Sequence, residues 1–92
     1  MAFSVRLTET AKRNLDSIDD PELLESLFQQ ILDLGEDPFP PGCAEMRKTK
    51  NLYRVHAEKA YRIIYRVPPN RRSVLIQRVE HRGRVYRGYD RW

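Results

Sequence analysis

Arginine side chains are concentrated between Tyr61 and Tyr86, in a pattern suited to binding phosphate. Eight of them lie on or just after this stretch: Arg62, Arg66, Arg71, Arg72, Arg78, Arg82, Arg84 and Arg87. The guanidinium group presents a planar fork of donors to phosphate oxygens and stays charged at any working pH. Because a β-hairpin needs no such cluster to fold, an anionic ligand is the simplest explanation.

RNA cleavage by the neighbouring 2′-hydroxyl is one reaction that such a surface could support. The hydroxyl must lose its proton, the pentacovalent phosphate must be stabilised, and the leaving 5′-oxygen must gain a proton. Fixed arginine charges suit the second task, but arginine is a poor proton donor at neutral pH. The candidates for proton transfer are therefore His56, His81 and Tyr86. Tyr86 could instead stack on an unpaired base, or simply pack within the fold.

The sequence gives no sign of a metal or cofactor. The acidic residues of the second half, Glu58, Glu80 and Asp90, are scattered, and Cys43 lacks the Cys/His spacing of a zinc site. There is no Gly-rich phosphate loop and no nucleophile elbow. A single cysteine forms no internal disulfide, so we expect a reducing, cytoplasmic location.

The charge distribution also favours an anionic partner. Residues 1–46 carry three basic and ten acidic side chains, a net −7, whereas residues 47–92 carry fourteen basic and three acidic, a net +11. Internal ion pairs can neutralise part of this difference, but the remainder predicts a positive field on one side of the molecule. Phosphate backbones are the first partner to expect, and acidic proteins the second.

The strands that must position these side chains follow from the alternation of apolar and polar residues. Residues 3–7, 51–56 and 61–67 alternate with a period of two, which is typical of strands with two different faces. Pro68-Pro69-Asn70 interrupts the pattern, because proline lacks an N–H and fixes φ, and an apolar run resumes at residues 74–79.

Two helices are predicted between the first and second of these strands. Thr8 is a candidate N-cap for a helix in which Ala11, Leu15 and Ile18 recur at helical spacing. Asp20 is a candidate N-cap for a second helix that starts at Pro21. Its apolar stripe consists of Leu23, Leu24, Leu27, Phe28, Ile31 and Leu34, and Gly35 suits its C-terminal cap.

These elements predict an α+β fold with the order β-α-α-β-β-β, in which two antiparallel helices pack on a mainly antiparallel sheet. Residues 36–42 form a rigid connector with three prolines, and residues 44–50 should run along the sheet edge. We expect one domain over residues 1–92, with no secretory signal and no apolar run of 18 residues that would span a membrane.

The polar faces of the strands should converge on one cationic surface. One strand contributes Arg54 and His56, the next Arg62 and Arg66, and the last Arg78. Arg82 and Tyr86 follow the last strand. Any one of these arginines, taken alone, could be an ordinary solvated strand residue.

At these residues the chain resembles the RelE/ParE superfamily of toxins, and more closely the RelE-type messenger-RNA interferases. The resemblance spans nearly the whole length, and its most specific part is YRIIYRV followed by HRGRVY. It implies a compact β-α-α-β-β-β toxin that enters the ribosomal A site, beside the 16S rRNA, and cuts messenger RNA there without a metal. It also implies an acidic antitoxin as protein partner.

The resemblance assigns roles to individual residues. It implies that the family's basic pair falls on Arg54 and His56 and that Arg62, Arg82 and Tyr86 occupy its other site positions. With the basic residues of the strands and of their edge, the predicted catalytic set is Arg62, Arg82, Tyr86 and His56, and the predicted RNA-binding set is Arg54, Arg66, Arg78, His81, Lys48 and Lys50. The best-known branch has lysines at the positions of Arg54 and His56. Because histidine can act as an acid or a base, the division of proton transfer between His56 and Tyr86 stays open at this stage. Other branches use an acidic residue near this region, for which Glu45 is the candidate.

Two alternatives remain open at this stage. ParE-like relatives share the fold, lack the nuclease residues and inhibit DNA gyrase by protein binding. The presence of both Arg82 and Tyr86 favours the interferase branch. The second alternative is an RNA-binding module without turnover.

Overall fold

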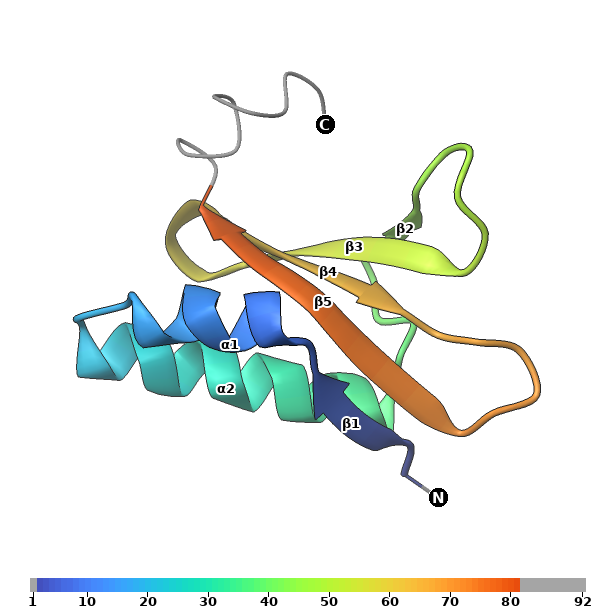
Figure 1. Ribbon diagram of the computed structural model, residues 1–92, viewed down its shortest axis with the longest axis horizontal. Helices are drawn as coiled ribbons and strands as arrows, with labels where there is room; N and C mark the ends of the chain where they lie inside the picture. Colours follow the sequence, from blue (N-terminus) through green and yellow to red (C-terminus); the bar gives the residue numbers. More distant parts are fainter. Residues whose placement is uncertain (1, 82–92) are drawn as a thin grey trace.

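A five-stranded mixed sheet with two α-helices against one face forms the structure (Figure 1). The computed structural model describes residues 2–81. The elements are, in chain order, β1 (Ser4–Leu7), α1 (Glu9–Asp16), α2 (Pro21–Glu36), β2 (Ala44–Glu45), β3 (Leu52–Ala57), the 3₁₀ turn η1 (Glu58–Ala60), β4 (Tyr61–Arg66) and β5 (Ser73–His81). This arrangement confirms the predicted α+β fold.

The order of the strands in the sheet is β1-β5-β4-β3-β2. Strands β2 to β5 pair antiparallel with their neighbours, whereas β1 runs parallel to β5. The helical hairpin between β1 and the later strands supplies the long connection that a parallel pair requires. The predicted strand at residues 74–79 is longer than expected and reaches His81.

Both helices begin where the sequence predicted. The Thr8 Oγ1 accepts a hydrogen bond from the Ala11 N–H at 3.0 Å, and one oxygen of Asp20 accepts from Glu22 N and Leu23 N. Each side chain satisfies backbone donors of the first turn that have no partner within the helix.

Gly35 does not cap α2, and the prediction that it would was wrong. The helix continues through Glu36, and its C-cap is Asp37. Gly35 is buried instead against β1, where a β-carbon would lie 2.8 Å from Val5 Cγ2 and 3.0 Å from the carbonyl oxygen of Phe3. The Phe3 N–H also donates to the Gly35 carbonyl at 2.7 Å. Glycine therefore allows the closest approach of helix to strand.

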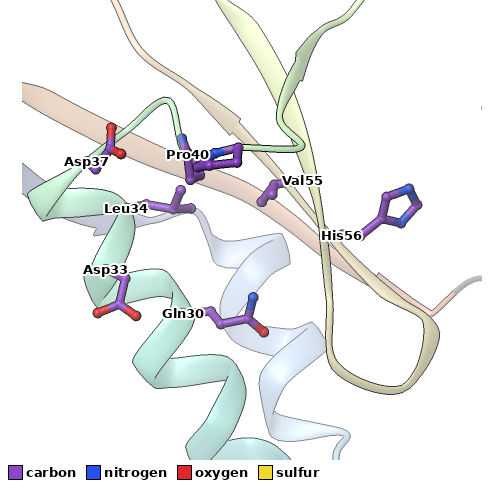
Figure 2. A pocket seen from close by; sticks show the side chains of 8 residues that line it. Gln30, Asp33, Leu34, Asp37, Pro40, Val55 and His56 are labelled. Carbon is purple, nitrogen blue, oxygen red and sulfur yellow. The ribbon is translucent and has the colours of Figure 1, made fainter.

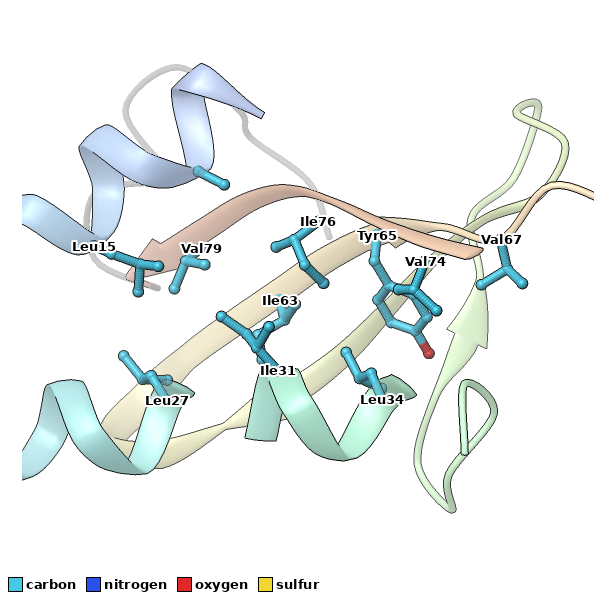
Figure 3. Packing of buried hydrophobic residues seen from close by; sticks show 11 residues of the cluster. Leu15, Leu27, Ile31, Leu34, Ile63, Tyr65, Val67, Val74, Ile76 and Val79 are labelled. Carbon is cyan, nitrogen blue, oxygen red and sulfur yellow. The ribbon is translucent and has the colours of Figure 1, made fainter. Parts of the chain in front are cut away.

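The hydrophobic core lies between the helices and the sheet (Figure 3). Leu27, Ile31 and Leu34 of α2 face the apolar side chains of β4 and β5 across it. The buried members are Ala11, Leu15, Leu27, Ile31, Leu34, Ile63, Tyr65, Val67, Val74, Ile76 and Val79. The apolar half of each predicted alternation therefore points toward the helices, which leaves the polar half on the opposite face.

The proline-rich connector is fixed to this core by Tyr65. The Tyr65 hydroxyl, in a fully buried side chain, donates to the Pro38 carbonyl oxygen at 2.8 Å. The Tyr53 ring stacks on that of Tyr65, with centroids 5.8 Å apart, and meets the Phe39 ring edge-on at 5.0 Å. These contacts set where the chain enters β2 and β3.

Neither α1 nor α2 is long and apolar enough to cross a bilayer.

Candidate nucleic-acid interface

The side of the sheet away from the helices, which we call the outer face, carries basic residues from several strands. On β3 and β4 it includes Arg54, His56, Arg62 and Arg66, which alternate with the core-facing residues of the same strands. In the strand register His56 lies opposite Arg62, and Arg54 lies opposite Ile64. The structure therefore brings these predicted residues together.

Arg78 and Glu80 join the outer face only because β5 contains a bulge. Strict alternation from Val74 and Ile76, both buried in the core, would turn Arg78 toward the helices. The register instead shifts, since Ile64 pairs with Arg78 while Tyr65 pairs with Ile76, which leaves Gln77 as the extra residue. The inserted residue reverses the alternation, so Val79 enters the core and Arg78 points outward.

Helix α1 and its N-cap supply hydrogen bonds to the bulge. The Thr8 hydroxyl donates to the Gln77 carbonyl oxygen at 2.7 Å, and the Thr8 N–H donates to that of Ile76 at 3.0 Å. The Val79 N–H donates to Asn14 Oδ1 at 3.0 Å. A bulge disrupts the ladder and leaves backbone groups to be satisfied elsewhere, and Thr8 and Asn14 satisfy them here.

The arginine nearest the centre of this arrangement, Arg62, is 8% exposed. It lies between His56 on β3 and Glu80 on β5 in the strand register. Glu80 in turn accepts a hydrogen bond from the Arg78 Nη1 at its Oε2, at 3.0 Å. The buried guanidinium of Arg62 is therefore held among polar neighbours, where a charge acts more strongly than in bulk water.

The loop between β2 and β3 carries the two predicted lysines, Lys48 and Lys50, both exposed. Arg66 donates to the carbonyl oxygen of Lys50 at 2.9 Å, which ties the loop to β4. Glu45 Oε2 accepts from the Asn51 N–H at 3.1 Å, so this carboxylate closes the loop. Lys48 and Asn51 both have φ near 64°, a left-handed conformation that requires such support.

His81 does not share the outer face with Arg78. It lies opposite Tyr61 in the register, and their rings meet edge-on with centroids 5.0 Å apart. Tyr61 packs against the hydrophobic core, so His81 is turned toward the helix side. Arg82 and Tyr86 lie outside the described residues.

A hollow of about 260 Å³ lies between α2, the connector and β3 (Figure 2). Its polar lining consists of the carboxylates of Asp33 and Asp37 with Gln30 and His56, and no arginine or lysine of the described residues lines it. Figure 2 shows the His56 ring pointing away from the helix side chains. This hollow is therefore unsuited to phosphate, and the cationic candidate site is the outer face of the sheet. Among residues 2–81, no three His, Cys, Asp or Glu side chains gather as they would around a metal.

The sequence and the fold both match known toxins. The family model of the ParE toxin of the type II toxin–antitoxin system parDE matches residues 5–86. Toxin RelG of Mycobacterium tuberculosis is 31% identical over 88 residues, which cover 95% of this chain and 99% of the relative. The chain belongs to the RelE/ParE superfamily of type II toxins.

Solved structures of RelE/ParE toxins share the fold. The toxin–antitoxin complex RelBE2 of Mycobacterium tuberculosis matches with a TM-score of 0.76 and 27% identity, over 89% of this chain and 100% of that one. The chromosomal ParDE system of P. aeruginosa matches with a TM-score of 0.69 and 16% identity, over 87% and 96%. The superfamily resemblance inferred from the sequence is thus confirmed.

The sequence analysis did not predict three residues that form or support the outer face of this RelE/ParE toxin. Arg6 lies opposite Leu75 in the parallel pair, so it extends the outer face onto β1, although its half of the chain is acidic. Glu80 was counted only as one of the scattered acidic residues, and Asn14 was not singled out. The alternation of Arg6 with Val5 and Leu7 was a usable signal, but nothing local to Asn14 indicated its bond to Val79.

Proposed function

We propose that this toxin is a metal-independent endoribonuclease that cuts messenger RNA in the ribosomal A site and so inhibits translation. The observation that carries the proposal is the convergence of Arg54, Arg62, Arg66 and Arg78 on one face of the sheet, with His56 opposite Arg62. Whole-length similarity to toxin RelG supports the same reading.

The proposed roles follow from burial and chemistry. Arg62, buried and charged, stabilises the pentacovalent phosphate together with Arg82. His56 or Tyr86 removes the proton from the 2′-hydroxyl and supplies one to the leaving 5′-oxygen, because a guanidinium is a poor acid and a poor base at neutral pH. Arg54, Arg66, Arg78, Lys48 and Lys50 hold flanking phosphates of the messenger and of 16S rRNA. His81 was expected in this set, but its place beside Tyr61 on the helix side makes direct phosphate contact less suited to it.

We infer that an acidic antitoxin covers the outer face in the inactive complex. The RelBE2 structure is a complex of a toxin with its antitoxin, and the matching toxin chain has the fold described here. One cationic surface does not neutralise two anions at once, so an acidic antitoxin segment and RNA would compete for the same arginines. Both partners would meet the toxin in the cytoplasm.

ParE-like inhibition of DNA gyrase is the second candidate. The match of residues 5–86 to the ParE toxin family model favours it. Under this alternative the arginines of the outer face would contact protein rather than RNA, and substitution of Arg62 would leave transcripts unaffected.

Primer extension on messenger RNA after induction tests the proposal, alongside a DNA supercoiling assay with purified gyrase. We expect discrete cuts within reading frames for the wild type, and none for Arg62→Ala. Arg13→Ala, which removes the same charge from the exposed surface of α1, should cut like the wild type. Intact transcripts combined with inhibited supercoiling would instead establish the gyrase inhibitor.

A further inference from the structure

Glu80 is the one acidic side chain that β3, β4 and β5 place on the outer face within residues 2–81. It lies two residues after Arg78 on β5 and directly opposite Arg62 on β4. Directly opposed residues of antiparallel strands have β-carbons about 5 Å apart, so the carboxylate lies close to both arginines. The bulge at Gln77 puts Glu80 there, as it does Arg78.

The two carboxylate oxygens of Glu80 have different surroundings. The Oε2 accepts from the Arg78 Nη1 at 3.0 Å, whereas the Oε1 is buried and accepts no hydrogen bond from the described residues. The Glu80 side chain is 10% exposed, against 39% for Arg78. A buried carboxylate with one unpaired oxygen disfavours folding, so stability alone does not account for a negative charge at this position.

The ion pair has a consequence for Arg78. Arginine has five N–H donors, and Glu80 accepts from one of them, on Nη1, which fixes the position of the Arg78 guanidinium. A side chain already held in place loses less conformational freedom when the ligand binds. In the strand register the same carboxylate lies on the residue directly opposite Arg62, and attraction between the two charges favours one position of that guanidinium.

We propose that Glu80 is a positioning residue of the outer face: it orients Arg78 and Arg62 for the scissile region of the RNA without contacting the RNA itself. This inference rests on the proposed nuclease function for its kinetic consequence. The effect of Glu80 on the mobility of the Arg78 and Arg62 side chains does not depend on whether the protein cleaves RNA.

Glu80→Gln separates positioning from binding and from folding. The variant keeps the shape and removes the charge, so electrostatic attraction for RNA rises while the arginines lose their anchor. We expect single-turnover cleavage about tenfold slower, an RNA dissociation constant equal to or lower than that of the wild type, and a melting temperature that is unchanged or higher. Glu25→Gln, at an exposed position of α2 in the helix layer, removes the same charge and should match the wild-type rate.

Side-chain NMR of the arginine Nε–H groups provides a readout that does not depend on activity. In the wild type, Arg78 and Arg62 should give ordered signals with slow solvent exchange, and Glu80→Gln should speed that exchange several-fold. Two results would overturn the positioning role. One is unchanged Nε–H exchange in Glu80→Gln; the other is slower RNA cleavage accompanied by weaker RNA binding and a lower melting temperature. A wild-type protein that binds RNA but never cuts it would refute the proposed function, while the exchange data would still decide the role of Glu80.

Discussion

At the scale of single residues, the buried hydroxyl of Tyr65 and the arginines of the outer face illustrate opposite uses of a polar group. Tyr65 is buried in the core and its hydroxyl donates to the Pro38 carbonyl oxygen. Burial raises the pKa of Tyr65 far above its ordinary value of about 10, and the nearby Cys43 thiol adds to the shift. The hydroxyl therefore stays protonated and serves the fold, whereas the proposed role of the arginines is to bind an anionic ligand through their fixed charge.

Tyr65→Phe should lower the free energy of unfolding by about 1–2 kcal/mol at pH 7, because the buried Pro38 carbonyl loses its donor. Above pH 10 the unfolded wild type releases the Tyr65 proton while the folded protein keeps it, so stability falls as pH rises. The variant should show a shallower fall in this range. Urea denaturation from pH 7 to 11 measures both effects, with Tyr61→Phe as the control; parallel pH profiles would refute the assignment.

Arg82 and Tyr86 carry the sharpest prediction about chemistry. Tyr86→Phe removes the hydroxyl and keeps the ring, whereas Tyr86→Ala removes both. If the hydroxyl transfers a proton, single-turnover cleavage by Tyr86→Phe should be about a hundredfold slower, the scale usual for general acid–base groups. If the ring only stacks on a base, Phe should be nearly active and Ala strongly impaired. His56→Gln, assayed in parallel, tests the other candidate for proton transfer, and full cleavage by Arg82→Ala and Tyr86→Phe would contradict the site.

At the scale of the elements, α1 and its N-cap contribute to the outer face without lying on it. Thr8 caps the helix and also donates to the carbonyl oxygen of Gln77, while Asn14 accepts from the Val79 N–H. The bulge that these contacts support decides which way Arg78 and Glu80 point. An element from the acidic half of the chain thus sets the geometry of the cationic half.

Asn14→Ala should lower the free energy of unfolding by about 1–3 kcal/mol, since the buried Val79 N–H is left without its acceptor. Hydrogen exchange of the Val79 amide should lose protection ahead of the amides of β4. Lys12→Ala, on the exposed surface of the same helix, is the matched control and should change neither quantity. Wild-type protection of Val79 in Asn14→Ala would show that the bulge does not depend on α1.

At the scale of the whole molecule, the two layers differ in charge. The helices and their connections belong to the half of the chain with net −7, and strands β3 to β5 belong to the half with net +11. The core between the layers keeps them apart, so the outer face retains its positive field. Binding at this face should therefore depend steeply on salt.

Arg54→Ala tests this field with a single-stranded oligoribonucleotide that carries a 2′-O-methyl group at each sugar, so that it is not cut. A plot of log binding constant against log salt concentration should be steep for the wild type. The slope should be smaller in magnitude by about 0.7 in the variant, because one phosphate contact is lost. Arg13→Ala removes the same charge from the helix layer and should leave the slope unchanged. A wild-type affinity insensitive to salt would contradict phosphate binding.

The sequence by itself determined the elements and most of the basic surface. Alternation along β3 and β4 places Arg54, His56, Arg62 and Arg66 opposite the apolar residues, and caps at Thr8 and Asp20 start the two helices. These signals are local, since side-chain period and capping depend on residues only a few positions apart.

Only the tertiary structure decided the rest of the face. Arg78 and Glu80 point outward because of the bulge at Gln77, which is supported by Thr8 and Asn14, 69 and 65 residues away from their partners. Arg6 reaches the same face through a parallel pairing, and Gly35 is required by its contact with β1 rather than by a helix end. The bulge, the parallel pairing and the Gly35 contact all depend on backbone groups that are distant in the sequence. A local sequence pattern does not indicate which distant group will satisfy a given hydrogen bond.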